Sequence, residues 1–435
     1  MLNIKLATFK SRLQHSLEFD NEIKSFIENI AKEIEAPLEM SELSDYDCDL
    51  KLIFIQTGGS EGLFLENIDI LQEPYYLLTN GGNNSLAASL EILTYLNQNG
   101  KKGEILHGNI SYIGKRIKEL AIMEKAAKLL KTSKLGVIGT PSDWLISSIP
   151  SYQKIKETLG LELVDISLKD IEEKAKAPHF TSVHPDNFNE YIKKDMVASI
   201  DIYDALKEVI KENHLSGATI RCFDLLTSLK ATGCLALAKL NEDGFIGACE
   251  GDIMAMISMF IAKLLTGQSN FQANPSRIDV DHNSIVFAHC TIPFDMVQSY
   301  SFNTHFESGI GVAIKGEMKT GNITIFRMSS DLKHYFVSKG ILMNNLKEEN
   351  LCRTQINVRL NKDVKELLKH PCGNHHVILY GDYEELIDQF MKKYFQFGRN
   401  NYKMALDMYY RILCEDCEQI CFCNSQSYRC LFIVN

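Results

Sequence analysis

The residues best suited to chemistry in this chain lie at the ends of apolar runs. Glu250 follows the apolar run Gly244–Cys249, His289 ends a second such run, and the adjacent His375 and His376 precede a third. Carboxylate and imidazole groups at strand ends are the donors from which buried sites for divalent metal ions are built. A carboxylate beside such an ion can also act as a general base. From position alone, Glu250 is either a surface residue at a helix start or a metal ligand and catalytic base, and His289 is either a buried core residue or a further ligand.

Neighbouring polar residues have simpler interpretations from position alone. Asp252 stands directly before an apolar helical segment, which is typical of a helix N-cap, and we predict that role. His305 and Glu307 are two residues apart in an extended stretch and therefore share one face, where they could contact a substrate. Adjacent strand residues point in opposite directions, so only one of His375 and His376 is expected to face the site.

The elements that must position these residues follow a clear order along the chain. Residues 1–130 alternate apolar strands, glycine turns and amphipathic stretches, and a second series of this kind begins at Lys134. Beyond Phe271, short β-rich segments separated by turns predominate. The fold class is therefore α/β, with two Rossmann-like α/β domains followed by a mainly β C-terminal domain. The predicted domains are 1–130, 131–270 with the glutamate, 271–397 with the remaining ligands, and an atypical cysteine-rich tail at 398–435.

Composition narrows the classes of partner. The chain has 435 residues and a formal net charge of −10, which disfavours binding to nucleic acid and to anionic lipid. The N-terminus turns polar too early for a signal peptide, and no apolar run approaches the roughly 18 residues that a membrane helix needs. The glycine turns after the first strands lack a P-loop lysine or a G-x-G-x-x-G motif, so they favour ordinary sharp turns over nucleotide binding. We expect a cytoplasmic protein.

Cysteines are numerous, but their spacing does not indicate a structural site. Seven are scattered singly, mostly within apolar segments, and read as buried thiols in their reduced form. The five between Cys414 and Cys430 are irregularly spaced and lack a partnering histidine in the tail. This favours a reduced tail over a zinc site.

Several short segments form an ordered set along the second half of the chain: Ile220–Asp224, Thr232–Leu237, Ala248–Asp252, Gln272–Asp279, Phe287–Thr291 and Gly373–Val377. Together they resemble the C-terminal half of the L-fucose and L-arabinose isomerase superfamily, and most closely its shorter fucose isomerase-like bacterial members. The resemblance runs from about Lys134 to Lys393, is weaker over 1–130 and stops near Gly398. It implies a three-domain fold, Mn²⁺ or a similar divalent ion, a small-molecule sugar substrate, and a homotrimer or homohexamer with sites near subunit contacts.

The resemblance also implies roles for individual residues and one departure from them. Fucose isomerases place their second metal carboxylate 24 residues after the first, and that spacing from Glu250 reaches Asn274. An asparagine can coordinate through its carbonyl oxygen but cannot accept a proton. Asn274 is therefore predicted as a ligand and Asp279 as the second catalytic group, although Asp281 could take that role and both aspartates could be turn residues. Arg221, within a matching segment, is predicted to bind substrate. The resemblance also implies that Glu250 and His289 bind the metal ion. It implies a late histidine as a further ligand, for which we favour His376, leaving His375 as a substrate contact.

The resulting functional prediction is a metal-dependent aldose–ketose isomerase that works through a cis-enediol. A free pentose, a deoxyhexose or a modified hexose would be the substrate, and the departure at Asn274 suits a sulfonated or otherwise C6-substituted hexose. A sugar-binding or regulatory relative that kept the fold and lost the base is the alternative. Bound metal and turnover over a panel of sugars would distinguish the two.

Overall fold

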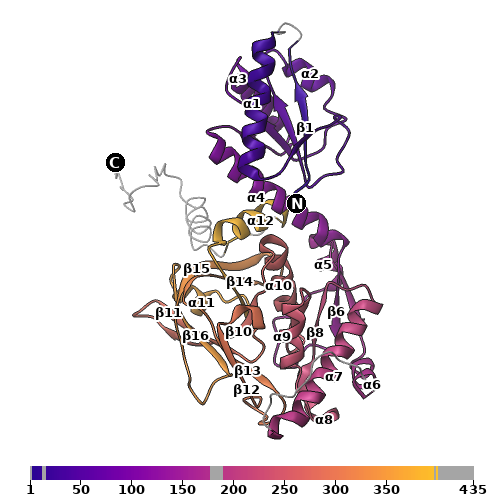
Figure 1. Ribbon diagram of the computed structural model, residues 1–435, viewed down its shortest axis with the longest axis vertical. Helices are drawn as coiled ribbons and strands as arrows, with labels where there is room; N and C mark the ends of the chain where they lie inside the picture. Colours follow the sequence, from indigo (N-terminus) through magenta and orange to yellow (C-terminus); the bar gives the residue numbers. More distant parts are fainter. Residues whose placement is uncertain (1, 12–15, 177–189, 396–397, 400–435) are drawn as a thin grey trace, which may run out of the picture.

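A computed structural model describes residues 2–11, 16–176, 190–395 and 398–399, of which 190–194 and 398–399 are described by their backbone alone (Figure 1). The tail cysteines, Cys414 to Cys430, lie outside the described residues. A parallel sheet forms from the N-terminal part of the chain, a second parallel sheet follows, and an antiparallel barrel closes the C-terminal part. This order matches the predicted α/β class with a β-rich C-terminal part. None of the helices in the described ranges has both the length and the hydropathy that a membrane-spanning helix requires.

The N-terminal sheet has the strand order β2-β1-β3-β4-β5, and all its pairings are parallel. Its strands are β1 (Ile4–Phe9), β2 (Leu38–Met40), β3 (Leu50–Ile55), β4 (Tyr75–Leu78) and β5 (Gly103–Leu106). Its helices are α1 (Leu17–Ile34), α2 (Glu61–Glu66) and α3 (Ser85–Gln98). Every residue of β3 is buried, as expected for a parallel strand covered on both faces.

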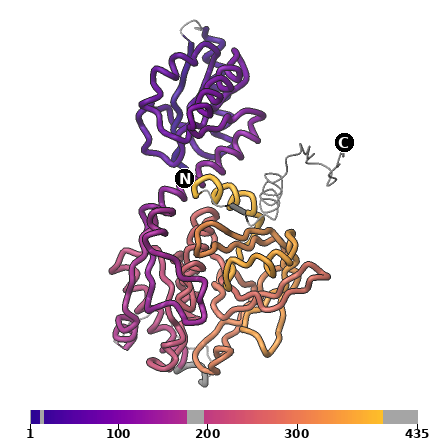
Figure 2. The backbone as a smooth tube through the Cα atoms, turned by 180° about the vertical axis from the view of Figure 1, so that it is seen from behind, coloured from indigo at the N-terminus to yellow at the C-terminus, as the bar shows by residue number. Residues whose placement is uncertain are grey.

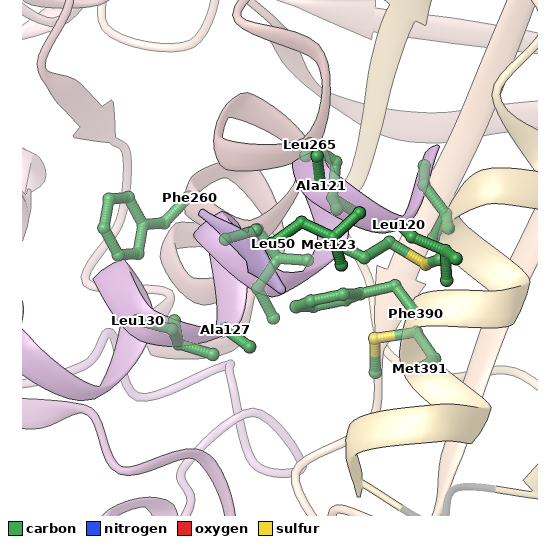
Figure 3. Packing of buried hydrophobic residues seen from close by; sticks show 14 of the residues in the cluster. Leu50, Leu120, Ala121, Met123, Ala127, Leu130, Phe260, Leu265, Phe390 and Met391 are labelled. Carbon is green, nitrogen blue, oxygen red and sulfur yellow. The ribbon is translucent and has the colours of Figure 1, made fainter. Parts of the chain in front are cut away.

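Helix α4 (Ile110–Thr132) joins the N-terminal sheet to the rest of the molecule (Figure 2). It packs against α1 on one side and against α10 (Ile253–Thr266) and α12 (Glu384–Phe395) on the other. Figure 3 shows this junction, where Leu120 and Met123 of α4 lie on the side of Phe390 of α12, and Phe260 of α10 lies on the side of Leu130. One continuous apolar core therefore connects the first and last parts of the described chain.

The middle sheet has the order β7-β6-β8-β9 and is also fully parallel. Its strands are β6 (Lys134–Ile138), β7 (Glu162–Ile166), β8 (Gly217–Ile220) and β9 (Ile246–Ala248). Its helices, besides α10, are α5 (Tyr152–Leu159), α6 (Leu168–Lys176), α7 (Glu190–Glu212), α8 (Leu225–Ser228) and α9 (Cys234–Glu242), and a 3-10 turn, η1, spans Cys222–Asp224. The carboxyl ends of β6, β8 and β9 meet at one edge, where ligands bind in open parallel sheets.

The C-terminal strands close into a barrel. The sheet order is β14-β17-β10-β11-β16-β15, and β14 also pairs with β15, which closes the ring. Its strands are β10 (Phe271–Asp279), β11 (Ser284–His289), β14 (Gly321–Met328), β15 (His334–Asn345), β16 (Thr354–Leu360) and β17 (His376–Tyr380). The C-terminal part also contains a separate hairpin, the 3-10 turn η2 (Phe294–Met296), helix α11 (Lys365–Lys369) and the short strand β18 (Gly398–Arg399). The hairpin consists of β12 (Ser299–Asn303) and β13 (Ala313–Glu317). Figures 1 and 2 show the barrel beside the middle sheet.

Candidate metal centre

Glu250 sits in a tight turn between β9 and α10. Its backbone φ is 65° and that of Gly251 is 70°, so both residues are left-handed. This conformation costs a residue with a Cβ about 1–2 kcal/mol, and such strain persists at functional positions when the surroundings hold it in place. Here Ser142 N–H donates to the Glu250 carbonyl at 3.0 Å, and Gly251 N–H donates to the Ile220 carbonyl at 2.9 Å. The turn is therefore fixed by the loops that follow β6 and β8.

The glycine after Glu250 is required by close packing. A Cβ at Gly251 would lie 2.8 Å from Pro141 Cα and 2.9 Å from the Thr140 carbonyl oxygen, both backbone atoms that cannot rotate away. On the other side, the Gln272 side chain accepts from Cys249 N–H at 2.8 Å. The apolar strand, the glycine and this amide together aim the Glu250 side chain toward the barrel.

Glu250, His289 and His375 form a buried cluster whose ligand atoms all lie within 4.8 Å of one another. Glu250 Oε1 is 3.4 Å from His375 Nε2 and 3.7 Å from His289 Nε2. The residues come from the turn after β9, the end of β11 and the residue before β17. This group of one carboxylate and two imidazoles could hold a metal ion, and it is a donor set that suits first-row divalent metals.

Each histidine of the cluster uses Nδ1 for a second contact and turns Nε2 toward Glu250. His375 Nδ1 lies 2.8 Å from Asp252 Oδ2, and His289 Nδ1 lies 3.0 Å from Thr291 Oγ1. His375 Nε2 is buried and has no hydrogen-bond partner within the described structure. A carboxylate on the far nitrogen of a metal-binding histidine fixes the ring and its tautomer. The arrangement therefore fits a resident metal ion better than a closed hydrogen-bond network.

Asp252 anchors this arrangement from the first turn of α10. Its side chain accepts from Ala255 N–H at 2.8 Å, which confirms the predicted N-cap, and it also contacts His375. Arg327, fully buried in β14, donates to the same Asp252 carboxylate through Nη1 and Nη2, each at 3.2 Å. The contacts of Asp252 with Arg327 and His375 were not predicted from the sequence, since these two residues lie 75 and 123 positions after Asp252 in the chain. Only the position of Asp252 beside Glu250 was a usable signal.

The charges in the cluster stabilise one another. Burial by itself raises the pKa of the Glu250 carboxyl, but His375 and His289 outweigh it and hold this pKa well below its usual range. Burial likewise opposes the charge on His375, yet Glu250 and Asp252 raise its pKa to about 9. Burial also raises the pKa of the Asp252 carboxyl. The positive charges of Arg327 and His375 outweigh this effect and lower that pKa to about 2. The site is therefore built to hold positive charge beside Glu250.

A tryptophan covers the second oxygen of Glu250. Trp144 Nε1 donates to Glu250 Oε2 at 2.7 Å from the loop after β6. Arg221 fixes this loop, since its Nη1 donates to the Pro141 carbonyl at 2.7 Å and its guanidinium pairs with Asp143 and Asp224. The guanidinium predicted to bind substrate is thus occupied by two carboxylates. Trp144 was not predicted as a site residue from the sequence.

The loop predicted for substrate contacts lies beside this tryptophan. His305 is buried and stacks edge-on against Phe223, which in turn stacks edge-on against Trp144, with ring centroids 5.4 and 5.0 Å apart. Glu307 is exposed on the same loop. The structure thus places His305 next to the residues that cover Glu250 and leaves Glu307 at the surface.

Asn274 and Asp279 of β10 lie at different distances from the cluster. Asn274 Oδ1 is buried without a hydrogen-bond partner in the described structure. Asn274 shares a face of β10 with Gln272, which contacts the residue before Glu250, so its oxygen is available on the side of the cluster. Asp279 ends the same strand, about 15 Å further along, and caps a turn by accepting from Asp281 and His282 N–H. The turn role of Asp279, which the sequence left open, is the one that the structure shows.

The two adjacent histidines are the reverse of the expectation. The structure places His375 in the cluster and turns His376 to the opposite face, between Phe287 and Phe336 with both ring centroids 5.8 Å away. The two histidines do point to opposite faces, as predicted. Which face each takes depends on the strand register: His376 pairs with Ala273, a residue of the barrel core, and therefore faces that core. His375 is therefore the candidate ligand in place of His376.

Comparison with known proteins gives no match to a family model. The chain is similar to a sulfoquinovose isomerase of Priestia aryabhattai, with 27% identity over 294 residues, 62% of this chain and 64% of the relative. A sulfoquinovose isomerase of Alkalicoccus urumqiensis is 23% identical over 321 residues, 69% of this chain and 72% of the relative. The match to the Priestia protein thus spans less than two thirds of that protein. These relatives support a sugar isomerase family, and the narrower likeness to fucose isomerases stays a prediction.

Proposed function

We propose that this chain is a metal-dependent aldose–ketose isomerase that acts on a modified hexose, with a C6-sulfonated hexose as the first substrate to test. The observation that carries the proposal is the buried cluster of Glu250, His289 and His375, with both Nε2 atoms facing one carboxylate oxygen. The similarity to sulfoquinovose isomerases supports the choice of substrate.

The donor set supports a divalent ion, and Mn²⁺ is the one we propose. Carboxylate and imidazole donors suit Mn²⁺, and the unpartnered Oδ1 of Asn274 would add an oxygen ligand to Glu250, His289 and His375. Held by these residues, such an ion would supply a Lewis acid for the oxygens of the sugar. Asp252 holds the His375 ring in the orientation that this role needs.

Glu250 is the proposed base. One of its oxygens faces the histidines and the other faces Trp144, so the carboxylate can bind an ion and still accept a proton. It would take the proton from C2 of the aldose, giving a cis-enediol, and return it to C1. A hydroxyl proton passes from O2 to O1 in the same rearrangement, so no oxidant or reductant is consumed. Because Asp279 lies away from the cluster, we assign both proton transfers to Glu250.

The test is Glu250→Gln, which keeps the size of the side chain and removes both its charge and its basicity. We expect bound Mn²⁺, measured by elemental analysis after gentle purification, to fall sharply. Turnover of a sulfonated hexose should fall by about 10²–10⁴-fold, the usual contribution of a general base.

Glu317→Gln is the matched control, since Glu317, at the end of β13, forms a surface ion pair with Lys347. It should leave metal and turnover unchanged. A Glu250→Gln protein that isomerises its sugar at the parental rate would refute the assignment. Wild-type protein that binds metal and sugar but turns over no sugar of the panel would instead favour the non-catalytic relative.

A further inference from the structure

A sugar that carries an anionic group needs a cationic partner near the cluster, and most of the arginines whose side chains the structure describes are already engaged. Among the described arginines, four pair with carboxylates: Arg116, Arg221, Arg277 and Arg327. Arg353 and Arg359 form no ion pair within the described residues. Arg359 is exposed on β16, whereas Arg353, just before β16, is partly buried. Arg353 is therefore the one to examine.

The guanidinium of Arg353 is held in place but not neutralised. Its Nε donates to the Thr304 carbonyl at 2.8 Å, and Nη2 donates to Thr304 Oγ1 at 3.4 Å. The group also lies over the Phe306 ring, 5.7 Å from the centroid. Glu307 of the same loop forms no ion pair with it in the described structure. A guanidinium fixed on one edge and free on the other is suited to bidentate binding of an oxyanion.

Strand pairing places Arg353 next to the candidate metal ligands. His289, the last residue of β11, pairs with Thr354, the first residue of β16, and Arg353 directly precedes Thr354 in the chain. Partners across antiparallel strands are about 5 Å apart at the Cα atoms. The backbone of Arg353 is thus adjacent to the residue that pairs with His289, a member of the cluster.

A chain of aromatic contacts reaches the same point from the other side of the cluster. Trp144 contacts Glu250, Phe223 stacks on Trp144, and His305 stacks on Phe223. Thr304, which anchors Arg353, is the residue before His305. The loop 304–308 therefore lies between the cover of Glu250 and the guanidinium of Arg353.

We propose that Arg353 binds the anionic substituent of the sugar, a sulfonate, while the other end of the sugar lies at Glu250, His289 and His375. This inference rests on the proposed isomerase function and adds the residue that determines its substrate class. Arg353 would act in recognition and take no part in the proton transfer.

The experiment compares the KM and kcat of Mn²⁺-loaded wild type, Arg353→Met, Arg353→Lys and Arg359→Met on a C6-sulfonated hexose and on its unsubstituted parent. We expect Arg353→Met to raise KM for the sulfonated hexose about 10- to 100-fold, the effect of losing a hydrogen bond to a charged group. Its KM for the parent sugar should stay unchanged. Arg353→Lys keeps the positive charge but lacks the two-pronged guanidinium, so its KM for the sulfonated hexose should lie between those of wild type and Arg353→Met. The KM of Arg359→Met should match that of wild type.

Metal content and thermal unfolding of each variant show whether the fold survives, and Arg353→Lys decides the question if Arg353→Met does not fold. An unchanged KM for the sulfonated hexose, or an equal rise for both sugars, overturns the role of Arg353. Wild type that isomerises only the unsubstituted sugar overturns that role while the isomerase proposal stands. Wild type that isomerises neither sugar removes the proposed function and this inference with it.

Discussion

Two adjacent residues on the two faces of the β10–β17 pair show how surroundings set the chemistry of one side chain. His375 and His376 are both almost fully buried, at 0% and 2% exposure. His375 lies between Glu250 and Asp252, and its pKa rises to about 9. His376 lies among aromatic rings with its Nδ1 on the Asn374 carbonyl, and burial, with Arg327, lowers its pKa to about 3. Burial alone favours the neutral ring, and two carboxylates reverse that preference.

The largest expected difference between these faces is in metal binding. His375→Gln removes a candidate ligand, and because loss of a mere outer-shell partner costs 10–100-fold, we expect Mn²⁺ affinity to fall by more than about 100-fold. His376→Gln should leave the affinity close to wild type. Isothermal titration of metal-stripped protein measures both. Equal losses in the two variants would show that the faces are not functionally separate.

The next largest effect is on the pH dependence of the stability of the metal-free protein. The pKa of His375 is raised from 6.5 to about 9, so its contribution is complete below pH ~6.5 and disappears as the pH rises to about 9. This is about 3 kcal/mol of unfolding free energy. The pKa of His376 is lowered to about 3, so its contribution is present above pH ~6.5 and disappears as the pH falls. Urea denaturation across pH gives both slopes.

The two variants serve as controls for each other in that measurement. His375→Gln should flatten the alkaline slope and keep the acid one, whereas His376→Gln should flatten part of the acid slope only. The comparison between faces fails if either variant alters the slope assigned to its neighbour.

A smaller effect should follow from removing the charge of Asp252. Asparagine caps a helix about as well as aspartate, so Asp252→Asn leaves the α10 cap intact and takes away the charged partner of His375. We expect metal affinity to fall about 10–100-fold, as for other second partners of ligating histidines. Asp279→Asn, at the distant end of β10, is the control and should change nothing. A loss with Asp279→Asn instead would return that residue to the site.

Sequence alone predicted the parts of this structure that depend on local pattern. The prediction of Glu250 and His289 as ligands combined their positions at the ends of buried strands with the resemblance to sugar isomerases. The order of parallel and antiparallel sheets followed from the same patterns. Closure of the barrel through the β14–β15 pairing was not predictable, since barrels and sandwiches both consist of alternating strands.

The incorrect or missing predictions concern features that are set by pairing between residues far apart in the sequence. Alternation correctly required one histidine of the pair to face away, but which one depends on the register of β10 against β17. Asp279 and Asn274 lie on one strand, and only the distance along that strand separates a turn residue from a candidate ligand. The contacts of Asp252 with His375 and Arg327 join segments far apart in sequence, and no local pattern marks them.

Trp144 is the only tryptophan in the chain, and its indole nitrogen donates to Glu250 at 2.7 Å while about half of the residue is exposed to solvent. Tryptophan emission from this protein therefore comes from a single fluorophore that contacts the candidate metal ligand. An ion or a sugar arriving at Glu250 would change the polarity around that indole. The unlabelled protein thus carries its own optical probe, in which metal and substrate titrations can be followed as shifts of one emission band.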